Sequence, residues 1–148
     1  MKLTIALLAL AAMSLARGKD ISLFNGQNLS AWNEPLGAWS VVGSVALDAA
    51  NPKAFSTQPG QGVMLSSAAG KSANIMSKAE HGDAEIHVEF TVPQGSNSGI
   101  YVQGRYEIQV FDSFGKATIA EHDCGAIYQR WDPKRGKGKE GYEGHTPK

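Results

Sequence analysis

The chain has 148 residues, and its 14 lysine and arginine side chains balance its 14 aspartate and glutamate side chains. A chain without excess positive charge lacks the field that displaces counterions from phosphates, so we expect no nucleic acid partner. Cys124 is the single cysteine, which excludes an internal disulfide and a metal cluster built on several cysteines. The length is sufficient for one domain with a hydrophobic core.

The N-terminus has the pattern of an export signal at residues 1–16. Lys2 provides a positive charge, Ile5–Met13 is an almost unbroken apolar run, and residues 14–16 fit a small-x-small cleavage site. We expect cleavage after Ala16 and a periplasmic or extracellular location. The apolar run is too short to span a bilayer in the usual way and no other run approaches its length, so we expect no membrane span.

Beyond the signal, the sequence predicts strands and turns, because it contains 17 glycines and little helical periodicity. The clearest strand is Ala84–Val92, in which apolar and polar side chains alternate. Alternation with period two indicates one buried and one exposed face. Pro93 ends the pattern because it has no backbone N–H to donate. Shorter strands are predicted at Trp39–Leu47, Gly62–Ser67, Asn74–Ser77 and Gly125–Tyr128.

A hairpin is predicted around Gly104, with strands at Gly99–Gln103 and Arg105–Asp112. In the second strand, Glu107 and Gln109 point to the same face because they are two residues apart. The register of the hairpin is open, since a slip of one residue exchanges the two faces. Whether Tyr101 shares the face of Glu107 is therefore also open.

The C-terminal residues 132–148 show no alternation and predict a loop. Antiparallel sandwiches normally return to cover their edges, so an end in a loop would leave sheets exposed. We therefore expect the chain to stop before its fold is complete. Unpaired edges would favour aggregation or dimerisation, and the sequence leaves the oligomeric state open.

Four sequence segments, in order along the chain, resemble the signatures of the 3-keto-disaccharide hydrolase domain family. They are Leu23–Trp32, Asn97–Tyr101, Tyr106–Asp112 and Cys124–Tyr128. The resemblance covers residues 21–148 and implies an all-β, concanavalin-like jelly-roll sandwich in an exported protein. It also implies a carbohydrate substrate, bound on a concave sheet and oxidised at the 3-position. Family members usually continue into further strands, which again predicts an incomplete C-terminus here.

A 3-keto group acidifies the hydrogen on carbon 2, so the glycosidic bond at carbon 1 can break by elimination, followed by addition of water. This route needs a general base, a donor for the enolate oxygen and an acid for the leaving oxygen. We predict Glu107, Asp112 and His145 as catalytic residues. Asp112 ends its strand, where a bulge could bring it onto the face of Glu107, and His145 follows a loop that could close over the site.

The predicted substrate contacts are polar and aromatic side chains on or near the hairpin: Asn97, Gln109, Tyr101, Glu89 and Tyr128. Asn97 could donate to a hydroxyl or ketone, and the two tyrosines could stack on a pyranose ring together with Trp131. Alternatively, the aromatic residues are core, Glu89 is an exposed strand residue, and Gln109 holds a neighbour in position.

No cofactor is predicted, although a divalent metal ion stays possible. The four histidines, His81, His87, His122 and His145, lack a tight ligand spacing. The alternative to a hydrolase is a non-catalytic carbohydrate-binding module that uses the same face. Two further alternatives are a glucanase that acts on unoxidised polymer and an inactive, shortened product.

Overall fold

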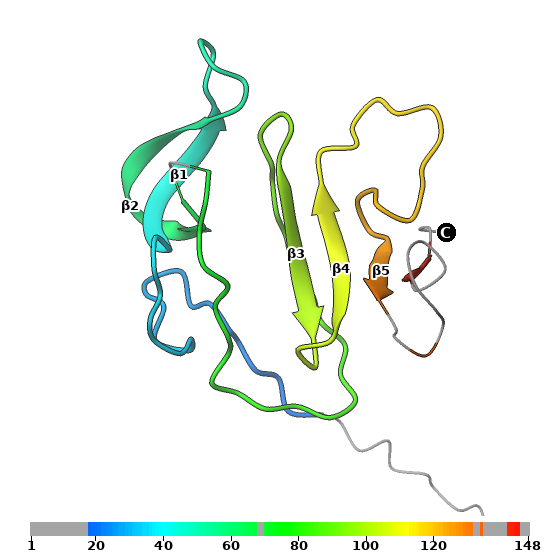
Figure 1. Cartoon of the computed structure of the whole chain (residues 1–148). Helices are drawn as coiled ribbons and strands as arrows, with labels where there is room; N and C mark the ends of the chain where they lie inside the picture. Colours follow the sequence, from blue (N-terminus) through cyan, green and yellow to red (C-terminus); the bar gives the residue numbers. More distant parts are fainter. Residues whose placement is uncertain (1–17, 68–69, 132–133, 135–141, 146–148) are drawn as a thin grey trace, which may run out of the picture.

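The computed structural model describes residues 18–67, 70–131, 134 and 142–145, with backbone alone at Trp131 and 142–145. Six strands form two antiparallel sheets, and this part of the chain contains no α-helix (Figure 1). The prediction of an all-β protein is therefore confirmed. The proposed signal at residues 1–16 lies outside the described residues. None of the segments described is a helix with the length and hydropathy that crossing a bilayer requires.

The first sheet is a two-stranded ribbon of β1 (Ser40–Leu47) and β2 (Phe55–Leu65). The prediction for β1 is confirmed to within one residue, whereas β2 begins well before the predicted Gly62. The two backbones approach closely where the register shifts between Val42 and Ser44. A Cβ at Gly43 would lie 2.7 Å from the carbonyl oxygen of Pro59, so only glycine fits at this crossing.

The second sheet has four antiparallel strands in the order β3-β4-β5-β6. They are β3 (Asn97–Val102), β4 (Tyr106–Phe111), β5 (Ile127–Trp131) and β6 (Tyr142–His145). The main strand contacts all lie within one sheet or the other, and the ribbon stands apart from the four-stranded sheet in Figure 1. The predicted hairpin is β3-β4, and it carries four of the eight predicted site residues, Asn97, Tyr101, Glu107 and Gln109.

A tight turn joins β3 to β4 and fixes their register. Gln103 and Gly104 have positive φ angles of 56° and 60°, and the N–H of Arg105 donates to the carbonyl of Val102 at 3.1 Å. Positive φ at both central positions is the pattern of a type I′ turn, whose twist matches that of the strands it joins. The ladder then runs without a register shift from Val102↔Tyr106 to Asn97↔Phe111.

The strand predicted at Ala84–Val92 does not form, and this prediction was wrong. Its backbone makes no hydrogen bond with any described residue, and Ile86, Val88 and Phe90 are 45%, 47% and 52% exposed. The physical reason is that alternation gives the segment one apolar face, whereas a strand also needs backbone hydrogen bonds to a neighbouring strand. Among the described segments, none pairs with it.

Two smaller predictions were also wrong. Asn74–Ser77 is not a strand; it contributes a single bridge between Ser77 and Trp32. The C-terminal region was expected to be a loop, but Tyr142–His145 forms β6 and pairs with β5. Backbone pairing at the edge of a sheet does not require alternation of side chains, so the sequence pattern gave no signal for β6.

The buried residues of the described chain are few. The buried apolar side chains are Leu29, Leu65, Val110 and Ala126, and the buried polar ones are Gln109 and Asp123. Burial in the second sheet is therefore concentrated where β4 meets the connection from β4 to β5. The strand that carries Glu107 and Gln109 is therefore packed against this connection.

Candidate functional site

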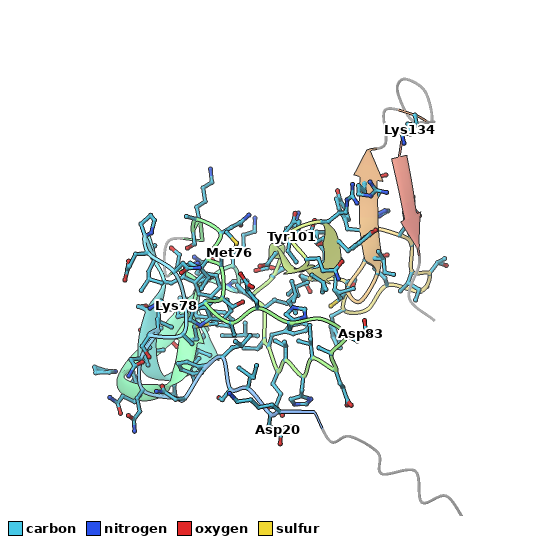
Figure 2. The ribbon with its side chains drawn as sticks, turned by 90° about the horizontal axis from the view of Figure 1, so that it is seen from below. Asp20, Met76, Lys78, Asp83, Tyr101 and Lys134 are labelled. Atoms are coloured by element: carbon cyan, nitrogen blue, oxygen red, sulfur yellow. The ribbon has the colours of Figure 1, made fainter. Side chains whose placement is uncertain are left out.

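The closest pair of predicted site residues is Tyr101 on β3 and Glu107 on β4. They are directly opposite each other in the ladder, so their side chains share one face. The Tyr101 hydroxyl donates a hydrogen bond of 2.7 Å to Oε2 of Glu107. Tyr101 is 52% exposed and is labelled in Figure 2. The register that the sequence left open thus brings an aromatic ring and a carboxylate together on an accessible surface.

The same hydrogen bond controls the ionisation of Tyr101. The bond to the Glu107 carboxylate raises the pKa of Tyr101 to about 12, with smaller contributions from partial burial and from the charges of Glu107 and Tyr128. A phenol that donates to a carboxylate is stabilised in its neutral form. Tyr101 is therefore a stable hydrogen-bond donor at neutral pH. Tyr128, from β5, is close enough to Tyr101 to contribute to this rise in pKa.

Gly99 provides the space that the Glu107 side chain occupies. A Cβ at Gly99 would lie 2.6 Å from Cγ of Glu107, closer than real Cβ contacts allow. The carboxylate therefore lies over the bare backbone of β3, between Gly99 and Tyr101. The group that lies closest to the Gly99 backbone is thus the side chain of Glu107, from the opposite strand.

Gln109 is on the same strand face as Glu107 but is covered. It is 2% exposed, and its Nε2 donates to the carbonyl of His122 at 3.2 Å. Its Oε1 is buried and has no hydrogen-bond partner. A buried amide that binds a loop carbonyl fits the alternative in which Gln109 holds a neighbour in position, here the connection between β4 and β5.

That connection, residues 112–126, is held by an ion pair between a buried aspartate and an exposed lysine, which no sequence pattern predicted. Asp123 has no exposed surface, pairs with Lys116, and accepts the N–H of Ala120 at 2.8 Å. The hydrogen bond from Lys116 is the main reason that the pKa of Asp123 lies below its usual value. The two residues are seven apart in a segment without periodicity, so no pattern indicated that they would meet.

Asp112 and Asn97 lie at the other end of the hairpin. Asn97 is opposite Phe111, and no bulge turns Asp112 toward Glu107. Five residues of strand separate Asp112 from Glu107, which is about 17 Å. The Asp112 carboxylate instead accepts the N–H of Gly95 at 2.8 Å and stabilises the turn before β3. The structure therefore does not bring Glu107 and Asp112 together.

The remaining predicted residues are distributed over other segments. Glu89 lies in the unpaired segment, 89% exposed, with Oε1 3.4 Å from Nε2 of His87. The His145 backbone is opposite Ile127 in the ladder of β5 and β6, and its side chain lies outside the described residues. Within the described ranges, no three His, Cys, Asp or Glu side chains are grouped to hold a metal ion.

Comparison with protein families gives one match that spans most of the chain. The family described as the 3-keto-alpha-glucoside-1,2-lyase-like domain matches residues 19–145. The chain belongs to this family. A search of curated proteins found no match, and a search of solved structures also found none.

Membership of the 3-keto-alpha-glucoside-1,2-lyase-like family indicates lyase-like or hydrolase-like activity on sugars, and a carbohydrate as substrate. The matched range includes both sheets and every predicted site residue. The family resemblance seen in the sequence is thereby confirmed. Within that range, the paired Tyr101 and Glu107 provide an accessible carboxylate beside an aromatic ring.

Proposed function

We propose that the chain cleaves 3-keto-glycosides by elimination across carbons 1 and 2, with Glu107 as the general base. The observation that carries the proposal is the hydrogen bond of 2.7 Å from Tyr101 to Glu107. It leaves Oε1 of the carboxylate directed at Gly99 and holds the side chain in one position. The family description, a 1,2-lyase-like domain, supports a bond change at the same two carbons.

In the proposed reaction, the Glu107 carboxylate removes the proton from carbon 2. The electron pair is delocalised onto the 3-keto oxygen as an enolate. It then forms the double bond between carbons 1 and 2 while the bond from carbon 1 to the glycosidic oxygen breaks. The leaving oxygen takes up a proton. Water next adds its hydroxyl to carbon 1 and a proton returns to carbon 2, so the net result is hydrolysis.

The other site residues take supporting roles in this proposal. Tyr101 fixes the orientation of Glu107, and its exposed ring, with that of Tyr128, offers a stacking surface for a sugar. Asn97 lies too far along β3 to reach the same carbons, which suits contact with a second sugar unit. His145 is proposed as the acid for the leaving oxygen, and Glu89 as a peripheral sugar contact.

Gln109 and Asp112 are proposed to act through other groups. Gln109 fixes the connection that contains His122, and Asp112 fixes the turn at Gly95. Both therefore position the hairpin and need not touch the substrate. This assigns the base role to Glu107 alone.

The complete fold and the location of the protein are inferred from the family resemblance. We infer that both antiparallel sheets are parts of a concanavalin-like jelly roll and that residues 1–16 direct export. The pattern of Lys2 followed by an apolar run supports export. A periplasmic or extracellular protein would meet oxidised disaccharides before their uptake by the cell.

The test is product release from 3-keto-trehalose, compared with unoxidised trehalose and laminarin. We expect cleavage of the keto sugar alone and a loss of about 10²- to 10⁴-fold in Glu107→Gln, the usual contribution of a general base. Ser98→Ala, an exposed neighbour on β3, is the matched control. Cleavage of laminarin would indicate a glucanase instead. Binding without turnover by the folded protein would indicate a carbohydrate-binding module, which the exposed Tyr101 ring would also suit.

A further inference from the structure

The segment Ala84–Val92 has the properties of a strand without a partner. Its residues 84–91 are all exposed, including three large apolar side chains on one alternating face. No backbone group of the segment bonds to a described residue. Asp83, labelled in Figure 2, stands immediately before it, and Pro93 closes it. An extended segment with free N–H and C=O groups is a template for pairing with another strand.

We propose that this segment pairs antiparallel with the same segment of a second copy of the chain, with the twofold axis at Val88. In that register Ile86 is opposite Phe90 twice, and Val88 is opposite itself. Branched and aromatic side chains directly opposite each other stabilise antiparallel pairs. Symmetric pairing of one patch with its own copy is also the commonest form of association between identical chains.

The order of polar side chains in the segment favours a second copy as the partner and selects the register. With the axis at Val88, His87 of each copy is opposite Glu89 of the other, and Glu85 is opposite the uncharged Thr91. Moving the axis to His87 brings Glu85 opposite Glu89, and moving it to Glu89 brings that carboxylate opposite its own copy. Like charges directly opposite are unfavourable in antiparallel pairs.

Other ways of pairing two copies are less favourable. A parallel, in-register pair would place Glu85, His87 and Glu89 each against its own copy. In an antiparallel pair whose twofold axis lies between two residues, each apolar side chain would be opposite a polar one, on both faces of the pair. An axis at Phe90 also opposes no two carboxylates, but it leaves residues 84–87 without partners inside the segment. The register centred on Val88 pairs the whole segment, keeps every apolar side chain on one face and opposes no two carboxylates.

Cysteine crosslinking of the full-length chain tests the register, in a Cys124→Ser background because Cys124 is a free thiol. Directly opposite residues have Cα atoms about 4.5–5.5 Å apart, within the range that a disulfide spans. Val88→Cys should therefore form a crosslinked dimer under mild oxidation. Glu85→Cys is the matched control, because its two copies would lie about 20 Å apart. Equal crosslinking of both variants would overturn the proposal.

Charge reversal tests the same interface in solution by light scattering after size exclusion. His87→Glu opposes carboxylates at two equivalent positions and should weaken the dimer by about tenfold. The double variant His87→Glu, Glu89→His again places a histidine opposite a glutamate at both positions and should restore the dimer. A wild-type chain that stays monomeric at every concentration, or a double variant without rescue, would contradict the proposal. Matched thermal unfolding midpoints would show that the variants are folded.

Discussion

The hydroxyl of Tyr101 and the carboxylate of Glu107 are joined across β3 and β4 by a hydrogen bond of 2.7 Å. One partner is on each strand, so the register of the hairpin decides whether the bond exists. The bond holds the carboxylate over Gly99, where no side chain of β3 competes for the space. A turn, a register and one glycine thus together define the position of the proposed base.

Replacing Gly99 by alanine should displace Glu107 and reduce activity on a 3-keto-glycoside by about tenfold or more. The new methyl group would occupy the position of the Glu107 side chain, 2.6 Å from its Cγ. A misplaced catalytic group commonly costs this much in rate. The backbone at Gly99 is not in the left-handed region, so alanine should leave the strand intact. Steady-state kinetics with Ser98→Ala as control measures the effect, and full activity of Gly99→Ala would contradict the assigned position.

The ionisation of Tyr101 provides a spectroscopic measure of the same contact. The difference between ultraviolet titrations of wild type and Tyr101→Phe should show one phenol that titrates near pH 12. In Glu107→Gln this pKa should fall toward its usual value, because the carboxylate that favours the neutral phenol is gone. A value that does not change in Glu107→Gln would contradict the described hydrogen bond.

The raised pKa of Tyr101 also has a consequence for stability at alkaline pH. Its folded value of about 12 is above the ordinary value of 10.0. The contribution to the free energy of unfolding is therefore complete below pH 10 and is lost as the pH rises through 12. Tyr101→Phe should remove this part of the alkaline decline. Denaturant unfolding of both proteins across this range measures it.

Sequence patterns predicted the hairpin well and the remaining fold in part. The alternation in Tyr106–Phe111 and the turn residue Gly104 were sufficient because a hairpin is a local structure. Ala84–Val92 has equally clear alternation, yet no strand forms there. Alternation indicates which face a strand would bury, but whether a neighbouring strand is present depends on distant parts of the chain.

The candidate site was predictable only where its geometry follows from one strand. Glu107 and Gln109 are two residues apart, and they do share a face. Their different exposures could not be predicted, because the loop carbonyl that covers Gln109 comes from His122 in another segment. The separation of Asp112 from Glu107 depended on the absence of a bulge, and sequence does not determine this.

The ion pair between buried Asp123 and exposed Lys116 should make the connection from β4 to β5 sensitive to acid. The folded pKa of Asp123 lies below its ordinary value of 3.8, chiefly because of Lys116. Its stabilising contribution is therefore present above about pH 4 and is lost as the pH falls through the folded pKa. In Asp123→Asn, hydrogen exchange at the N–H of Ala120 should be faster at neutral pH. Unchanged exchange would show that the pair does not hold the connection.

Removal of the carbon-2 proton by Glu107 is tested most directly by running the reaction in deuterium oxide. Elimination followed by hydration should place one solvent deuterium on carbon 2 of the released 3-keto sugar at early times. Parallel incubations with Glu107→Gln and without protein measure spontaneous exchange beside the ketone. Product that retains its original hydrogen at carbon 2 would contradict the account and indicate direct hydrolysis.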